Sequence, residues 1–204
     1  MPRPFGVLAL QGDFAAHAAA FRALGVPVRE VRRVGELDAL AGLVIPGGES
    51  TTLLKLMQDE PWFEALRRYH ERGGFLAGTC AGAILLAREV RPRQPSLALL
   101  DAVVERNAYG RQIDSFEARV EAPALGGTVD AVFIRAPRFR ALFPDVEVLG
   151  RHAGEPVLVR QGNVVAGTFH PELTRGRELH AYVARLAGAL ASTPNRALDA
   201  AVGA

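Results

Sequence analysis

The sequence predicts an α/β fold, a three-layer sandwich with a mostly parallel central sheet and an antiparallel or mixed flank. In the first half of the chain, short apolar runs alternate with helical patterns, which is typical of a parallel sheet covered on both faces. In the second half, strand-like segments follow one another without obvious helices between them, which indicates the flank. The length of 204 residues and the hydrophobic content of 49% suit a single core.

The first half predicts four strands with helices between them. Continuous apolar runs predict buried strands at residues 5–10, 26–31 and 42–45, and from residue 75 to the bend at residue 80. Helical patterns follow at residues 14–24, 49–57 and 61–72. Asp13 is placed to cap the first helix, because its carboxylate can accept hydrogen bonds from free backbone N–H groups. Gly73-Gly74 ends the third, since glycine suits the turn after a helix.

The second half begins after a short apolar helix that follows Cys80 and a proline-broken loop at residues 91–96. Strands are expected at residues 98–105, 113–121, 128–134 and 146–151, and in a hairpin formed by residues 157–160 and 164–167. A closing helix is expected at residues 177–190, where apolar side chains recur on one face. We expect one domain over residues 1–190 and a frayed tail over residues 191–204.

Composition and charge exclude several classes of protein. The net charge is +2, and the arginine pairs are scattered rather than arranged in a basic stripe, so we expect no nucleic-acid partner. No apolar run reaches membrane-spanning length, and the N-terminus lacks a signal-peptide pattern. Cys80 is the only cysteine, which excludes an internal disulfide and a four-thiolate zinc site. These features predict a cytoplasmic protein without a membrane partner.

Cys80 lies where an apolar strand runs into an apolar helix, with Gly78 and Gly82 two residues to either side. A sharp strand-to-helix elbow needs such glycines, because its strained backbone approaches its neighbours closely. N–H groups at the start of the helix would stabilise a thiolate. A lone cysteine in an apolar run is ordinarily a packing residue, but packing alone requires neither glycine. We therefore predict that Cys80 is a nucleophile.

His170 and Glu172 follow the last predicted strand, with a proline between them that limits rearrangement. Alone, they are better explained as a buried histidine beside a surface glutamate. With an elbow cysteine in the chain, His170 becomes the general base and Glu172 the group that orients its ring. The remaining histidines lack such a partner in the local sequence and are assigned no role: His17, His70, His152 and His180.

Other polar segments also follow predicted strand ends, which lie at the ligand-binding edge of an open parallel sheet. They are Gln11-Gly12 and residues 46–50, Pro-Gly-Gly-Glu-Ser. The second segment is either a simple turn before a capped helix or part of the site. As part of the site, the Gly48 N–H would form an oxyanion hole with the Ala81 N–H. Arg106 and Arg135 either form surface ion pairs or hold a substrate carboxylate.

These segments together resemble a known family. Residues 78–82, Gly-Thr-Cys-Ala-Gly, with His170-Pro171-Glu172 resemble the class I, triad-type glutamine amidotransferases. Within that class, five segments look like the glutaminase subunit of pyridoxal 5′-phosphate synthase: residues 6–12, 46–52, 106–112, 133–137 and 168–174. The likeness covers nearly the whole chain up to about residue 190, whereas residues 91–96 and the tail match no motif of the family.

The resemblance implies a flavodoxin-like domain that hydrolyses L-glutamine to glutamate and ammonia, without a metal or organic cofactor. The ammonia would pass to a lyase-type synthase subunit in a hetero-oligomer, for the synthesis of pyridoxal 5′-phosphate. Cys80, His170 and Glu172 would form the triad, and Gln11 would lie towards the synthase. Six residues would surround the glutamine: Gly48, Glu49, Ser50, Arg106, Ile134 and Arg135.

Two alternatives remain open at this point. A γ-glutamyl peptidase or hydrolase would use the same triad on another amide, and a non-catalytic regulatory subunit would keep the fold without turnover. The complete triad disfavours the second of these. We also expect the Gly47-Gly48 turn to act as a switch, because rotation of one peptide would supply or withdraw an oxyanion donor when the partner docks.

Overall fold

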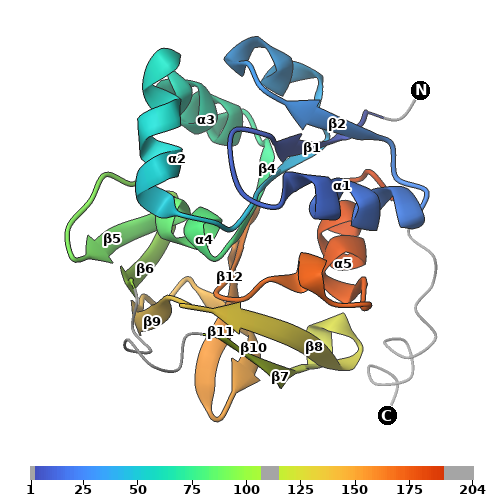
Figure 1. Cartoon of the computed structure of the whole chain (residues 1–204), viewed down its shortest axis with the longest axis vertical. Helices are drawn as coiled ribbons and strands as arrows, with labels where there is room; N and C mark the ends of the chain where they lie inside the picture. The colour runs from blue at the N-terminus through green and yellow to red at the C-terminus, as the bar shows by residue number, and fades with distance from the viewer. Residues whose placement is uncertain (1–2, 107–114, 191–204) are drawn as a thin grey trace.

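The computed structural model describes residues 3–106 and 115–190. Its largest element is a nine-stranded sheet with the order β2-β1-β3-β4-β12-β11-β10-β7-β8 (Figure 1). The strands from β2 to β12 pair in parallel, and those from β12 to β8 pair antiparallel, which confirms the predicted sheet and its flank. The strands are β1 (Phe5–Leu8), β2 (Val28–Val31), β3 (Gly42–Ile45), β4 (Phe75–Thr79), β7 (Ser115–Ala122), β8 (Gly127–Ile134), β10 (Glu147–His152), β11 (Glu155–Gln161) and β12 (Val164–Gly167).

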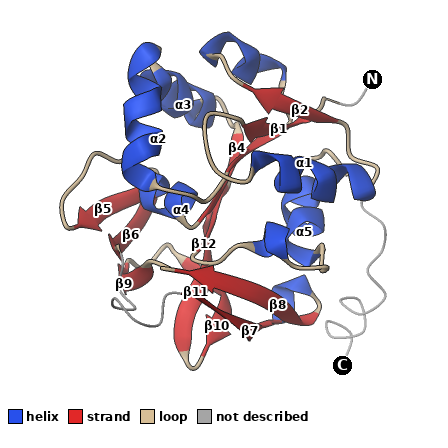
Figure 2. Ribbon diagram, in the orientation of Figure 1, coloured by secondary structure: helices blue, strands red, loops and turns tan. Residues whose placement is uncertain are grey.

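Helices cover both faces of the parallel part of this sheet (Figures 1 and 2). Helices α1 (Phe14–Ala23) and α5 (Glu178–Leu186) share one apolar cluster with Val7 and Val44. Helices α2 (Ser50–Leu56), α3 (Trp62–Glu71) and α4 (Ala81–Leu86) share the other with Leu43 and Ile45. Neighbouring residues of one strand thus face opposite layers, because side chains alternate along a strand. Short 3-10 segments join these elements: η1 (Val34–Ala39), η2 (Met57–Asp59), η3 (Pro123–Leu125) and η4 (Pro171–Leu173).

A second sheet of three strands has the order β5-β6-β9 and lies beside α4 in the view of Figure 2. Its strands are β5 (Ala87–Arg91), β6 (Leu100–Glu105) and β9 (Arg138–Leu142). Of these three strands, only β6 is predicted from the sequence. Strands β5 and β9 each bury two residues or fewer, so their sequences lack the apolar run that marks a buried strand.

Several element ends differ from the prediction. The last helix ends at Leu186 rather than at residue 190, and Gly188 follows with a φ of 69°, a conformation that glycine adopts readily. The predicted tail at residues 191–204 and most of the polar segment at residues 106–112 lie outside the described residues, as does the start of the strand predicted at residues 113–121. Asp13 caps α1 as predicted, since its carboxylate accepts a hydrogen bond from the Ala16 N–H at 3.3 Å.

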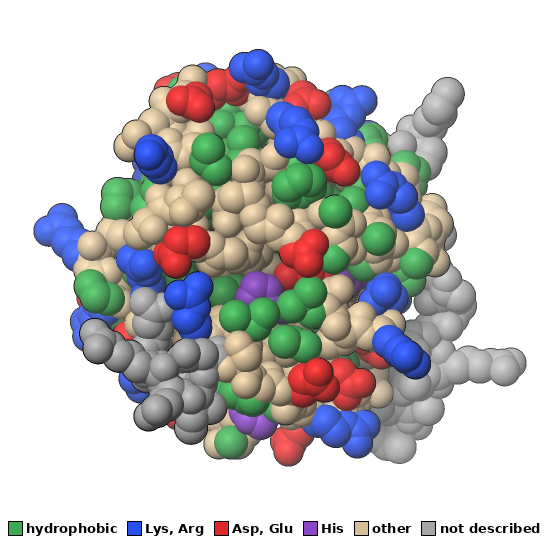
Figure 3. Space-filling model, viewed as in Figure 1, with side chains coloured by type: hydrophobic (Ala, Val, Ile, Leu, Met, Phe, Trp, Pro, Cys, Tyr) green, Lys and Arg blue, Asp and Glu red, His purple; other side chains and the backbone are tan. Residues whose placement is uncertain are grey.

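Charged side chains of both signs are interspersed over the face shown in Figure 3. In the described part of the chain, the longest helices, α1 and α3, have ten residues each, whereas a helix that crosses a bilayer needs about twenty.

Candidate active site

Cys80 sits on a strained bend between β4 and α4. Its φ is 48° and its ψ is −102°, which is unusual for a residue other than glycine. The flanking glycines make this bend possible. A Cβ at Gly82 would lie 2.0 Å from the Ile45 carbonyl oxygen, and one at Gly78 would lie 2.6 Å from the Gly82 backbone. The predicted elbow is therefore present, and close backbone packing is the reason for both glycines.

His170 lines the same pocket as Cys80, although the two residues are far apart in the sequence. It follows β12, and its backbone N–H donates to the Val132 carbonyl at 2.7 Å, which anchors it against β8. Its ring interacts electrostatically with Cys80, and its Nδ1 lies 2.8 Å from Glu172 Oε1. His170 and Glu172 are both buried, as is Cys80. The fold thus brings together the three residues that the sequence predicts as a triad.

These contacts decide the protonation of the two buried groups. Burial disfavours a charged ring, but the interactions with Cys80 and Glu172 outweigh it and raise the pKa of His170 to about 10. Burial also opposes ionisation of Glu172, but contacts with His17 and His170 outweigh it and hold the pKa of the carboxyl well below its usual range. His170 is therefore suited to hold a proton between a carboxylate and the cysteine sulfur.

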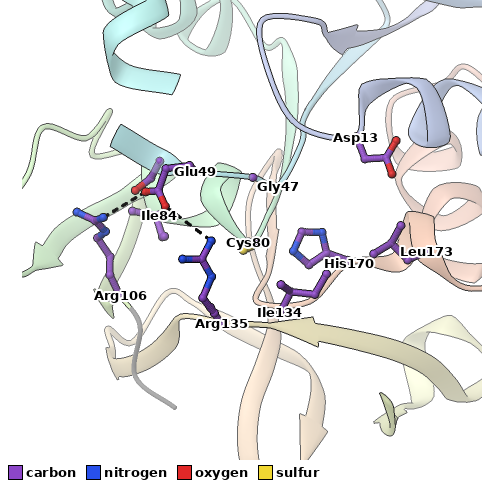
Figure 4. A pocket seen from close by; sticks show the side chains of 12 residues that line it. Asp13, Gly47, Glu49, Cys80, Ile84, Arg106, Ile134, Arg135, His170 and Leu173 are labelled. Carbon is purple, nitrogen blue, oxygen red and sulfur yellow. Dashed lines mark hydrogen bonds and ion pairs between the residues drawn. The ribbon is translucent and has the colours of Figure 1, made fainter. Parts of the chain in front are cut away.

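A pocket of about 250 Å³ opens in front of Cys80 and His170 (Figure 4). Nine of the residues that the sequence analysis places in the candidate site line this pocket: Gly47, Gly48, Glu49, Ser50, Cys80, Arg106, Ile134, Arg135 and His170. Its volume suits a ligand of the size of one amino acid.

Glu49 and two arginines form a charged group at one side of this pocket (Figure 4). The Glu49 carboxylate lies 3.5 Å from an Arg106 guanidinium nitrogen and 4.0 Å from one of Arg135. The ion pairs considered from the sequence are thus formed, and both arginines also line the pocket. Arg135 has a φ of 40°, so its backbone is strained at this point as well.

Gln11 holds the Gly47-Gly48 turn at the edge of the pocket. Its Nε2 donates to the Gly47 carbonyl at 3.2 Å, and its Oε1 accepts from the Glu49 N–H at 3.1 Å. A Cβ at Gly48, whose φ is 129°, would lie 2.1 Å from Gln11 Oε1, so only glycine fits there. In a trans peptide the N–H points opposite to the C=O, so the Gly48 N–H points away from Gln11.

The comparison with known proteins agrees with this geometry. A model of the SNO glutamine amidotransferase family matches residues 7–187. The chain belongs to this family. The pyridoxal 5′-phosphate synthase subunit PdxT of a strain of Thermus thermophilus is 55% identical to it over 186 residues, which are 90% of this chain and 97% of the relative. PdxT of Deinococcus radiodurans is 48% identical, over 90% of this chain and 96% of the relative. A crystal structure of a glutamine amidotransferase has a TM-score of 0.86 at 52% identity, covering 90% of this chain and 98% of that one.

In this member of the glutamine amidotransferase family, the site also contains residues that the sequence did not single out. His17 lies 3.1 Å from Glu172, and Gln94 accepts a hydrogen bond from the Ser50 hydroxyl at 3.2 Å. Asp13, predicted only as a helix cap, lines the pocket together with Ile84 and Leu173. The local sequence gives His17 no partner, because Glu172 is distant along the chain. Its position four residues before the buried Phe21, on the inner face of α1, is the one local signal of burial.

Among residues 3–106 and 115–190, no three or more histidine, cysteine or acidic side chains are grouped so as to hold a metal ion.

Proposed function

We propose that this chain hydrolyses L-glutamine to L-glutamate and ammonia, and that it supplies the ammonia to a pyridoxal 5′-phosphate synthase subunit. One observation carries the proposal. Cys80, on a strained elbow, lines a pocket of amino-acid size together with a buried histidine that interacts with it electrostatically and that a carboxylate orients. Membership of the glutamine amidotransferase family and the likeness to PdxT subunits support the substrate and the partner.

In the proposed reaction, the Cys80 thiolate attacks the side-chain amide carbon of glutamine and forms a tetrahedral intermediate. His170 protonates the amide nitrogen, the C–N bond breaks, and ammonia leaves a γ-glutamyl thioester on Cys80. His170 then takes a proton from a water molecule, which attacks the thioester carbon. The C–S bond breaks, and glutamate and the free thiolate are released. Glu172 stabilises the imidazolium throughout.

Two backbone N–H groups would bind the oxyanion of the intermediates. Ala81 is the first residue of α4, so its N–H has no partner within the helix. Gly48 lines the pocket, and its N–H points away from Gln11. Each such donor contributes about 3 kcal/mol to stabilisation of the transition state in acyl-transfer enzymes.

The charged group at the pocket is suited to bind the α-carboxylate and α-ammonium of glutamine. Arg106 and Arg135 would hold the carboxylate, and Glu49, which now pairs with both arginines, would exchange part of that pairing for the ammonium. Ile134 offers an apolar contact for the methylene groups, and Gly48 and Ser50 complete the wall.

The Gly47-Gly48 turn is proposed as the switch that couples hydrolysis to docking of the synthase. Gln11 bonds to both sides of this turn and so holds the Gly48 N–H in the direction that the oxyanion hole requires. A partner that fixes Gln11 would keep this donor in place, whereas rotation of the Gly47-Gly48 peptide would withdraw it. Activity that depends on docking would prevent loss of ammonia to solvent. Equal rates of glutamine hydrolysis with and without the synthase would exclude the switch.

Glutamine hydrolysis by the wild type and by Cys80→Ala, each alone and with the synthase subunit, tests the proposal. Release of ammonia and glutamate is expected from the wild type, and a loss of at least about 10³-fold from Cys80→Ala. Turnover of γ-glutamyl peptides in preference to glutamine would favour the peptidase. Unchanged function of Cys80→Ala would favour a non-catalytic subunit.

A further inference from the structure

A second buried histidine lies against the carboxylate of the triad. Glu172 uses Oε1 for His170, and its other oxygen, Oε2, lies 3.1 Å from His17 Nε2. Both His17 and Glu172 are almost entirely buried, with 1% and 6% of their surface exposed. A buried carboxylate needs a donor at each oxygen, and His17 is placed to supply the second.

His17 is held in place by two other elements. Its Nδ1 lies 3.0 Å from His180 Nε2 on α5, and its Nε2 lies 3.3 Å from the hydroxyl of Thr79, the residue before Cys80. His17 itself does not line the pocket. The His17 ring, on α1, therefore contacts both His180 on α5 and Glu172. It does so outside the pocket where a substrate would bind.

The hydrogen-bonding capacity of Glu172, His17 and His180 determines which ring nitrogens carry a proton. An ionised carboxylate can only accept, so the His17 nitrogen that faces Glu172 must carry a proton. Nδ1 of a neutral His17 is then an acceptor, which the Nε2–H of His180 satisfies. Burial lowers the pKa of His180 to about 3, so this ring is neutral and has one N–H to donate. With this proton order, the Nε2–H of His17 faces Glu172 Oε2, a buried oxygen that has no other hydrogen-bond partner among the described residues.

We propose that His17 is a positioning residue, whose Nε2–H binds Glu172 Oε2 and fixes the carboxylate so that Oε1 faces His170. The inference rests on the proposed function. The terminal torsion of a glutamate has a broad energy minimum, so a carboxylate bound at one oxygen only is poorly fixed. Donors at both oxygens define its plane. This plane in turn sets the direction in which the His170 ring faces Cys80.

Steady-state kinetics of the full chain with its synthase partner test the role of His17. His17→Leu is expected to lower kcat by about 10-fold to 100-fold and to leave KM for glutamine within about 2-fold, because His17 does not line the pocket. His17→Gln should restore most of kcat, since its amide N–H can reach the position of Nε2. His70→Leu, the same change on α3, is the control and should keep the wild-type kcat. The proposal is overturned if the kcat of His17→Leu is within about 3-fold of the wild-type value, or if the kcat of His17→Gln is no higher than that of His17→Leu.

NMR of the full-length wild type with ¹⁵N-labelled histidine tests the same contact without any activity. A proton on His17 Nε2, in a neutral or a charged ring, is expected, and a bare Nε2 overturns the proposal. This result separates the two hypotheses. Absence of glutamine hydrolysis by the wild-type complex would refute the proposed function, whereas the protonation of His17 decides the contact with Glu172 in either case.

Discussion

At the scale of single residues, the backbone of Cys80 shows how this chain places a thiol beside the pocket. A positive φ at a residue with a Cβ costs about 1–3 kcal/mol, and it persists only where the surroundings enforce it. Here the enforcement comes from Gly78 and Gly82, which let β4, α4 and β3 approach more closely than side chains would allow. The strain turns the sulfur out of the sheet and towards the pocket.

The close approach at Gly82 predicts a specific loss of stability. In Gly82→Ala, the new Cβ meets a backbone oxygen at 2.0 Å, so α4 must move away from β3. We expect a loss of about 1–3 kcal/mol in the free energy of unfolding, measured with urea. Gly35→Ala is the control, because a Cβ there meets nothing within 4 Å. A Gly82→Ala variant as stable as Gly35→Ala would contradict the explanation of the elbow.

His180 predicts a dependence of stability on pH. Its pKa falls from 6.5 to about 3, chiefly through burial, with His17 and Arg177 adding to the effect and Glu172 opposing it. Between these pH values the unfolded state binds a proton at residue 180 and the folded state does not, so stability falls as the pH falls from about 6.5 to 3.

His180→Gln keeps a donor for His17 and removes the titration. As the pH is lowered, the free energy of unfolding of His180→Gln should therefore fall less steeply than that of the wild type. The two slopes should differ by up to about 1.4 kcal/mol per pH unit. Above about pH 7 the two proteins should give parallel curves. Curves that stay parallel down to about pH 4 would show that His180 does not titrate in this way. Urea unfolding at a series of pH values measures the difference.

At the scale of elements, the two sheets are joined by a pair of side-chain hydrogen bonds. Gln161, at the end of β11, accepts from the Asp101 N–H at 2.7 Å and donates to the Asp101 carboxylate at 2.9 Å. Asp101 belongs to β6, the central strand of the small sheet. This strand ends at Glu105, next to the pocket residue Arg106, so the link between the sheets also helps to place that arginine.

Gln161→Leu removes both of these hydrogen bonds, so the Asp101 N–H loses its partner and the carboxylate keeps only its ion pair with Arg88. We expect a loss of about 1–2 kcal/mol in the free energy of unfolding, measured with urea. The same change at the exposed Gln58 provides the control and should alter stability by less than about 0.5 kcal/mol. Equal stabilities of the two variants would mean that the link contributes little.

At the scale of the whole molecule, one apolar cluster extends under both sheets. It combines Leu43 and Leu76 of the large sheet with Leu100 and Val104 of the small one, and α2, α3 and α4 pack against it. The opposite face of the large sheet has its own cluster beneath α1 and α5. Because the large sheet contributes to both clusters, neither can lose its packing without exposing the other.

This shared packing predicts that residues 1–190 unfold as one unit, as expected from the sequence. Differential scanning calorimetry should give a single transition, with a ratio of calorimetric to van't Hoff enthalpy of about 1. Two separated transitions, or a ratio well above unity, would show instead that the small sheet is an independent unit.

The layers of the fold could be predicted from the sequence, and so could the proximity of Cys80, His170 and Glu172. Continuous apolar runs mark β1, β3 and β4, because both faces of these strands are buried. The glycines beside Cys80 mark the elbow, because local backbone geometry requires them. Such signals lie within a few neighbouring residues and can therefore be read without the fold.

The contacts between distant segments could not be predicted from the sequence and are visible only in the folded chain. His17 faces Glu172 because α1 and η4 pack together, and Gln11 reaches Gly47 because β1 and β3 are adjacent strands. Strand β9 pairs with β6 although its own sequence buries only Phe139. The role of a buried polar side chain depends on the group to which it hydrogen-bonds. When that group is distant in the sequence, the residues around either partner do not indicate the contact.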